Sequence, residues 1–313
     1  MKSCITRTKL FLLLLVITLF SCIEENCSSC NEHNSYNEQF TVSFHGSYAV
    51  TKSSSAFKAG VESSIFTYYS GEDPSVKKEH PGTPVSVISD LYGNFQLTNN
   101  LSLYLAPGYY DFYAISSNSS SLDDISFKMG QSLTLKNGTD YLWAQRKNVA
   151  ICDHSKIEFS FSHIAVSIVI EVNPKMGSQI DSGHVELTKA IIGLPNTNQR
   201  LKLAYGKITP AKSITSLKAE MNITQNIANY LLLPIEQKID IPIELHITTI
   251  SHSKQTSQET YYCKLPSPPN GFEGGMQYKY RATISTRKII FDNASVEQWN
   301  EKELDNIVLS ENI

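Results

Sequence analysis

Apolar and polar residues alternate along much of this chain with a period of two. The clearest run is 239–247, where aliphatic residues at the odd positions alternate with charged or polar residues and Pro242. Residues two apart lie on the same face of a strand, so this pattern predicts antiparallel sheets with one face in a core and the other in water. Pro242 has no amide hydrogen to donate, which predicts an edge strand or a bulge at this position.

Other segments show the same alternation, in one case with a change of phase. Apolar side chains occupy every second position in 278–284 and in 110–114. In 157–172 they occupy odd positions at first and even positions later. Because a slip of one residue exchanges the two faces of a strand, a bulge near Ser162 and His163 would keep one core face continuous.

A polar segment near the middle of the chain interrupts the pattern. Residues 173–183 lose the apolar period and gather Asn, Pro and Gly, so we predict a linker there. The sequence therefore predicts an all-β protein with two tandem antiparallel β-sandwich domains of Greek-key type. We expect the N-terminal sandwich at 39–173 and the C-terminal sandwich at 184–313.

The end of the chain is compatible with two kinds of structure. Val296, Trp299 and later apolar residues approximate the period of a helix, and Ser295 with Gln298 could form a capping box. Residues 307–309 could instead form a short strand. The sequence leaves helix and strand open for 295–309.

The N-terminus has the parts of a secretory signal peptide. Basic residues precede an apolar run at 10–20, which is shorter than the ~20 residues of a bilayer-spanning helix. The run ends in Leu19-Phe20-Ser21-Cys22, which resembles a bacterial lipobox, in which the cysteine carries the lipid. We predict a signal peptide at 1–21, lipidation of Cys22 and a flexible tether at 22–38. An ordinary secretory signal with a chance cysteine is the alternative.

Charge and cysteine content narrow the possible functions. The 313 residues carry a net charge of −3, and the lysines and arginines are scattered, so we expect no nucleic-acid partner. The six cysteines are too few for a disulfide scaffold in a chain of this length. Cys27 and Cys30 form a C-x-x-C pair in the tether, without the βα context of a redox motif or a second pair of metal ligands.

Motifs of catalysis are absent from the sequence. It contains no G-x-S-x-G, H-E-x-x-H or Walker A motif. The adjacent carboxylates Glu72-Asp73 and Asp123-Asp124 could hold Ca²⁺ or act in acid–base chemistry, but such pairs are common in loops. His163 lies in a strongly apolar strand, and we interpret it as a structural residue. We therefore expect no enzyme activity, no metal and no cofactor.

Seven short segments follow one another along the chain in a characteristic order. They are 40–44 (FTVSF), 51–53 (TKS), 57–60 (FKAG), 108–114 (GYYDFYA), 142–144 (LWA), 161–163 (FSH) and 275–280 (GMQYKY) followed by Trp299. In order and spacing they resemble the fimbrillin-like proteins of Bacteroidota, the type V pilins and their relatives. Residues 23–25 (IEE) similarly resemble the acidic signal that sends lipoproteins of these bacteria to the outer face of the outer membrane.

This resemblance implies transthyretin-like β-sandwich domains and a role in fimbriae. In type V pilins a lipoprotein precursor reaches the cell surface, and a trypsin-like protease removes the first strand together with its lipid. A strand of the next subunit then fills the groove. Here the removable strand would be about 40–50, with Phe40, Val42 and Phe44 as its inward residues.

The resemblance also implies a cleavage site and a donor strand. Cleavage would fall between Lys52 and Ser53, with Lys58 as the next candidate. The donor strand would be formed by Ile307, Val308 and Leu309. An arginine-specific protease requires arginine at the cleavage site, whereas position 52 is lysine. Two outcomes therefore stay open. A lysine-tolerant protease could cut the chain, or the chain could stay uncut and lipidated, as fimbrial anchors do.

We thus expect a lipoprotein on the surface of the outer membrane. In a fimbrium it would be a shaft subunit, a tip subunit or the anchor. Its partners would be other fimbrial subunits through strand exchange, the outer membrane through the lipid, and a host or bacterial surface receptor. The alternative is a surface glycan-binding β-sandwich lipoprotein. Such a binder would need exposed aromatic side chains, and Trp143 and Trp299 both lie in segments where the family motifs hold structural residues.

Overall fold

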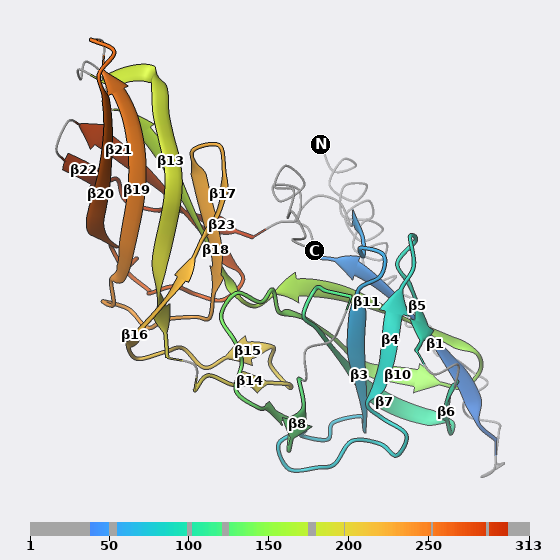
Figure 1. Ribbon diagram of the computed structural model, residues 1–313. Coiled ribbons are helices and arrows are strands. Elements are labelled where there is room, and N and C mark those ends of the chain that lie inside the picture. The colour runs from blue at the N-terminus through green and yellow to red at the C-terminus, as the bar shows by residue number, and fades with distance from the viewer. Residues whose placement is uncertain are drawn as a thin grey trace, which may run out of the picture.

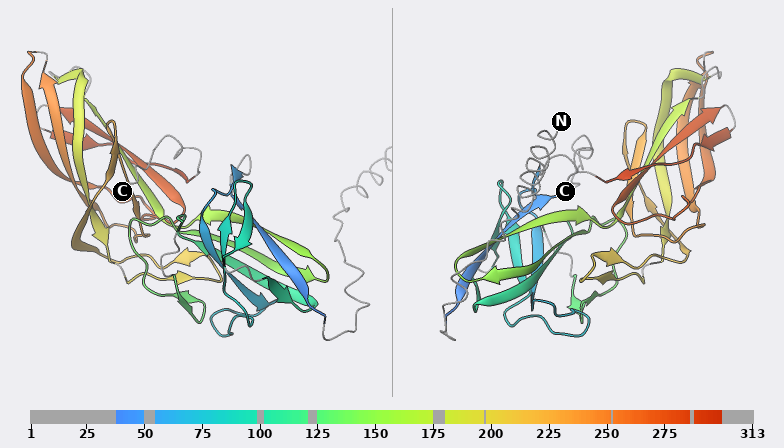
Figure 2. Two further views of the ribbon diagram at one scale, coloured as in Figure 1. Left: turned by 45° about the vertical axis from the view of Figure 1, so that its right-hand side comes forward. Right: turned by 180° about the vertical axis from the view of Figure 1, so that it is seen from behind.

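The protein folds into two β-rich lobes. The computed structural model describes residues 38–49, 55–98, 102–120, 125–174, 180–196, 198–251, 253–285 and 288–299. These residues contain 23 strands and no helix, which confirms the all-β prediction. Strands from the first half of the chain form one lobe, and most strands from the second half form the other (Figures 1 and 2). Within the described ranges, no helix is long and apolar enough to cross a membrane.

The N-terminal lobe is a sheet whose two ends meet. In the described part of the chain, seven of its strands form a closed ring in the order β1 (Phe40–Tyr48), β5 (Asn94–Leu97), β4 (Val85–Ser89), β3 (Glu62–Tyr69), β7 (Gly108–Ser116), β10 (Leu142–Ile151) and β11 (Ser155–His163). Two short strands, β2 (Ser55–Ala56) and β6 (Leu103–Leu105), pair with β1. Neighbouring strands of the ring are antiparallel, except that β1 and β11 are parallel and close it.

This ring differs from the two open sheets expected for the N-terminal half. Alternation predicts which face of a strand is buried, and one sheet that curls until its edges pair satisfies it as well as two facing sheets do. The interior of the ring is filled by side chains from all seven strands, among them Phe44, Phe112 and Phe159. Closure pairs the edges that an open sheet would leave exposed.

The C-terminal lobe is a sandwich of two sheets. One has the order β17 (Asn222–Thr224), β18 (Ile227–Leu232), β12 (Val166–Pro174), β21 (Met276–Ser285) and β22 (Lys288–Phe291), with β23 (Ser295–Gln298) also on β21. The other has the order β16 (Ile214–Glu220), β13 (Ile180–Pro195), β19 (Ile241–Ser251) and β20 (Thr256–Leu265). Apolar side chains of both sheets share one core, to which Ile168 and Leu245 belong.

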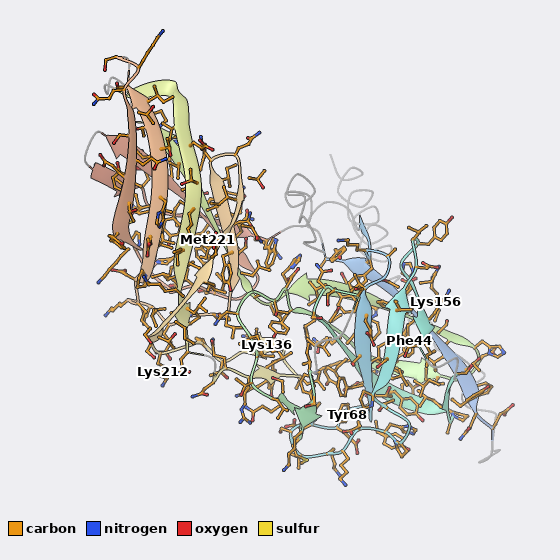
Figure 3. All side chains as sticks on the ribbon, in the orientation of Figure 1. Phe44, Tyr68, Lys136, Lys156, Lys212 and Met221 are labelled. Carbon is orange, nitrogen blue, oxygen red and sulfur yellow. The ribbon has the colours of Figure 1, made fainter. Side chains whose placement is uncertain are left out.

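A small fourth sheet joins the two halves of the chain. Its order is β15 (Lys207–Ile208), β14 (Leu201–Lys202), β9 (Gln131–Ser132) and β8 (Phe127–Lys128). Lys202 pairs with Gln131 across the two halves. Beneath this sheet a further apolar core includes Tyr68, from the outer face of the ring, and Leu203. Figure 3 labels Phe44, Tyr68 and Met221, one buried residue from each of the three cores.

The chain crosses from the ring to the sandwich at Ile164 and Ala165. These are the only residues between β11 and β12, which belong to different sheets. The predicted bulge near Ser162 and His163 is therefore wrong. The apolar residues change from odd to even positions there because β11 ends and β12 begins. The two strands bury their apolar faces in different cores, so the positions need not match.

The segment predicted as a linker lies inside the C-terminal lobe. Residues 173–183 include the end of β12 and the start of β13, which are on opposite sheets of the sandwich. Asn, Pro and Gly mark a reversal of the chain as readily as a domain boundary. The sheet topology thus places 166–174 with the C-terminal sandwich, and not in the predicted N-terminal range 39–173.

Two local features of the C-terminal half depend on strands that are distant in the sequence. Pro242 lies in β19, which is a central strand between β13 and β20. The hydrogen-bonded pairing of β19 with β13 ends at Ile243. Pro242 lies just outside this pairing, so its missing amide hydrogen breaks no bond to β13. The sequence left helix and strand open for 295–309, and the structure shows that the start of this segment, Ser295–Gln298, is strand β23 on the edge of β21.

Buried tyrosines predict a loss of stability at alkaline pH. Burial is the main cause that raises the pKa of Tyr110 to about 12 and that of Tyr113 to about 12, against ~10 in an unfolded chain. The unfolded chain therefore ionises first, and stability falls as the pH rises from about 10 towards 12. The melting temperature, measured at a series of alkaline pH values, should fall with rising pH. In the Tyr110→Phe variant this fall should be smaller. Tyr262→Phe, at an exposed position, should not; equal slopes for all three proteins would contradict the prediction.

Candidate assembly site around the first strand

Strand β1 is paired along both of its edges. On one edge, residues 42–48 lie opposite 155–161 of β11 in a parallel register. On the other edge, β1 pairs in turn with β6, β5 and β2, all antiparallel. Since the first strand is an interior member of the ring, its removal would leave two facing sheet edges with unpaired backbone groups.

The inward face of β1 is part of the ring core. Val42 is 4% exposed and Phe44 is 2% exposed, whereas Phe40 is partly buried against the same cluster. The ring of Phe44 lies with its centroid 6.1 Å from that of Phe112 and 6.1 Å from that of Phe159. Full burial of such a side chain contributes roughly 1.5–3 kcal/mol, so loss of β1 would remove several kcal/mol of burial from the core.

The second half of β1 is matched in shape to its groove. A β-carbon on Gly46 would lie 2.7 Å from the Phe95 ring, so any larger residue there would force this buried ring to move. The Gly46 amide donates to the carbonyl of Gly93 at 2.7 Å. Tyr48 stacks on Phe57 with 4.9 Å between ring centroids. These contacts specify one register for a strand in this position.

The last described residue of the chain lies beside the end of β1. The Trp299 ring stacks on His163 with 3.9 Å between centroids, and the Tyr48 ring lies 6.2 Å from His163. His163 is buried, and its Nδ1 is 2.8 Å from a carboxylate oxygen of Asp140, which agrees with its interpretation as a structural residue. Ala49 and Trp299 line one cavity of ≈300 Å³. The two points where the chain leaves for 50–54 and for 300–313 are thus close together.

Most of the predicted processing residues fall outside the described ranges. These are Cys22, Lys52, Ser53, Ile307, Val308 and Leu309. Lys52 and Ser53 belong to the segment 50–54 that connects β1 to β2, and these two strands pair with each other at Tyr48 and Ser55. A cut anywhere in 50–54 would separate β1 covalently from the rest of the ring.

The other candidate residues do not form a chemical site among the described residues. No group of three or more His, Cys, Asp or Glu side chains in these ranges could hold a metal ion. Asp73 is exposed, and a hydrogen bond from the Ser75 amide lowers the pKa of its carboxyl group. Asp123-Asp124 and Cys27-Cys30 lie outside the described ranges.

Sequence reasoning did not find the partners of β1 or the role of Gly46. Its pairing with β11 joins residues more than a hundred positions apart, and alternation carries no information on such pairs. One signal was present. A glycine within the alternating run 40–48 often marks a place where another group approaches the backbone closely.

This chain belongs to the fimbrillin-like family, whose model matches residues 49–299. The match begins at the residue after β1. Among the solved structures that share the fold are the following three. A protein described as a putative cell adhesion protein from Bacteroides uniformis is 16% identical with a TM-score of 0.61, and the alignment covers 84% of this chain and 99% of that one.

The second structure, also described as a putative cell adhesion protein, comes from Bacteroides ovatus. It is 17% identical with a TM-score of 0.56, covering 84% of this chain and 99% of its own. The third is a fimbrial protein from Bacteroides vulgatus, 14% identical with a TM-score of 0.52, covering 84% of this chain and 100% of its own. No curated protein sequence matches the chain. At these identities the likeness concerns the fold alone.

Proposed function

We propose that this protein is a fimbrial subunit or anchor, exported as a lipoprotein through Cys22, that assembles by β-strand addition at the groove of β1. Membership of the fimbrillin-like family supports a fimbrial or adhesive role at the cell surface. The fold that it shares with a fimbrial protein from Bacteroides vulgatus agrees with that role. The observation that carries the mechanism is the position of β1, which closes the ring. Its covalent connection to the other strands of the ring runs through 50–54.

Strand exchange follows from the pairing of β1. Loss of this strand would expose the apolar side chains that Val42 and Phe44 now cover and would open the edges of β11 and β5. A strand from another subunit would restore both sets of interactions if its apolar residues were spaced two apart. Ile307 and Leu309 have this spacing, which makes the tail of a neighbouring subunit the proposed donor.

Processing at Lys52 would decide between the two roles. A chain cut between Lys52 and Ser53 would lose β1 together with the lipid and become able to accept a donor strand. An uncut chain would keep β1 and stay in the outer membrane as an anchor. In both cases the assembled fimbrium would contact a receptor on a host or bacterial surface.

The N-terminus and intact mass of the protein from the native cell surface test this proposal. A matured subunit should begin near Ser53 without lipid, and an anchor should begin at a lipidated Cys22. The Cys22→Ser variant should lose the lipid-dependent mass and its retention at the surface. Protein that is found inside the cell with its first 21 residues intact would contradict the proposed export.

A further inference from the structure

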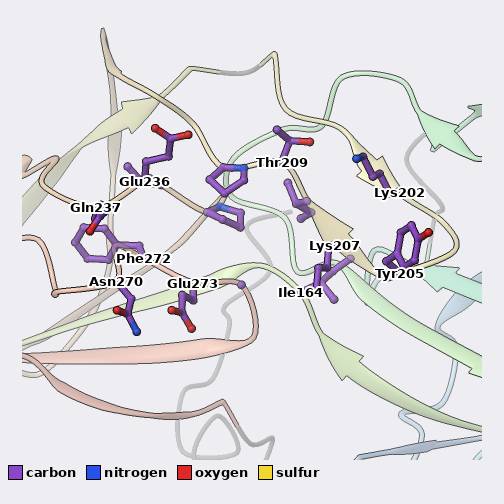
Figure 4. Close-up of a pocket in the computed structure, with 16 residues that line it drawn as sticks. Ile164, Lys202, Tyr205, Lys207, Thr209, Glu236, Gln237, Asn270, Phe272 and Glu273 are labelled. Atoms are coloured by element: carbon purple, nitrogen blue, oxygen red, sulfur yellow. The ribbon is translucent and has the colours of Figure 1, made fainter.

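A cleft of ≈1000 Å³ lies where the small fourth sheet meets the C-terminal lobe (Figure 4). One wall is the β14–β15 hairpin, and the other is formed by the segments 234–237 and 270–274. Figure 4 shows Tyr205 on the hairpin side and Glu236 on the opposite side. The volume is at the upper end of the ~300–1,000 Å³ that is usual for small-ligand sites. None of the residues that line the cleft belongs to β1.

The hairpin wall holds an exposed tyrosine on a fixed backbone. Tyr205 is 63% exposed, and the amides of Tyr205 and Gly206 both donate to the carbonyl of Lys202. The Trp143 indole N–H donates to the carbonyl of Leu203 at 2.8 Å. Gly206 has a φ of +60°, and a β-carbon there would lie 2.3 Å from the Trp143 ring. Trp143 thus fixes the turn that presents the Tyr205 ring.

The opposite wall is also held in place by the fold. Ile235 and Phe272 exchange two backbone hydrogen bonds of 3.0 and 2.9 Å, and Phe272 is buried. The Glu273 amide donates to the Tyr278 hydroxyl at 2.7 Å. The exposed side chains of Glu236 and Glu273 therefore start from backbone that is already ordered. A ligand that binds between two fixed walls pays little for ordering the protein.

The chemistry of the lining indicates a neutral, hydroxyl-rich ligand. Its charged side chains are two lysines and two glutamates: Lys202, Lys207, Glu236 and Glu273. The formal charges of these four side chains cancel, and Glu236 also pairs with Lys212 outside the lining at 4.0 Å, so neither sign of charge dominates the cleft. The lysines donate, the carboxylates accept, and the amide of Asn270 does both, as the hydroxyl groups of a sugar require. Tyr205 adds a rigid amphipathic face on which the apolar side of a sugar ring can stack.

From these observations we propose that the cleft binds a neutral oligosaccharide. The volume favours several sugar units over a single one. Binding at this site would give the protein an adhesive specificity of its own.

Binding of the purified protein to a panel of neutral oligosaccharides tests this inference. The panel should contain mannose, galactose and N-acetylglucosamine series, with sialylated and sulfated forms and extended peptides for comparison. We expect a neutral oligosaccharide to bind, and Tyr205→Ala to weaken its Kd about tenfold. Tyr262→Ala, which removes a tyrosine that is 76% exposed on β20, is the matched control and should leave the Kd unchanged.

Ionic strength and a second variant separate the possible ligands. The Kd of a neutral oligosaccharide should stay constant when the salt concentration is raised from low to well above physiological values, because no net charge is screened. Glu273→Ala should weaken binding without changing the melting temperature, since this side chain is exposed. The inference is overturned if no neutral oligosaccharide binds, if only charged sugars or peptides bind, or if Tyr205→Ala and Tyr262→Ala have the same effect.

Discussion

The double substitution Val42→Asp with Phe44→Asp should abolish folding of the protein. Both side chains lie inside the ring, where no basic group is available among the core residues around them. An unpaired buried carboxylate costs several kcal/mol, and two of them approach the whole stability of ~5–15 kcal/mol that is usual for a domain. Immunoblots of surface protein and thermal unfolding of purified protein should both show its loss.

The outer face of the same strand offers a matched control. Thr41→Asp with Ser43→Asp adds the same number of charges to β1, but Ser43 is exposed. The hydroxyl of Thr41 lies 2.6 Å from Nδ1 of His154, where a carboxylate would find a favourable partner. We expect near-normal amounts of folded protein from this control. Normal amounts from the Val42 and Phe44 variant would show that β1 is not needed to complete the ring.

A chain that begins at Ser55 should fold only when a peptide of residues 38–49 is added. Without β1, the ring lacks the strand between β11 and β5 and exposes its core to water. The peptide carries the inward residues and both hydrogen-bonding edges, so it should restore a cooperative melting transition. Circular dichroism in the aromatic region, recorded with and without peptide, would follow this restoration.

Variant peptides test whether the groove selects one register. A Gly46→Val peptide should fail to restore folding, because its side chain would collide with the Phe95 ring. A Ser43→Val peptide, altered at an exposed position, should still restore it. Strand exchange at this groove would be untenable if the shortened chain folded alone, or if the two peptides acted equally.

Local pattern predicted the strands well and their partners poorly. Alternation identified the buried face of 239–247, and the structure buries Ile241, Ile243, Leu245 and Ile247 there. The same pattern could not reveal that β1 meets β11, because pairing between distant segments depends on the whole topology. It also read the crossing at Ile164 as a bulge, since both give the same change of phase.

The cleft shows a different limit of sequence reasoning. Tyr205 has no distinguishing neighbours in the sequence, and Trp143, which positions its turn, is about sixty residues earlier. The tryptophan was assigned to structure from its motif, and its hydrogen bond to Leu203 agrees with this. What the motif could not show is that the structural role of Trp143 includes presenting another aromatic residue to solvent.

Closure of the ring by β1 has a consequence for how a row of subunits would grow. A cut chain would offer one vacant slot and one tail, so identical copies could add head to tail in an open row. Because β1 runs parallel to β11, a donor that keeps this direction gives every copy the same orientation, and the row acquires a polarity. Under the proposed function, an uncut chain would fill its own slot, so it could donate a strand but would not accept one. Retention of nine residues would be enough to turn a repeating unit into a terminus.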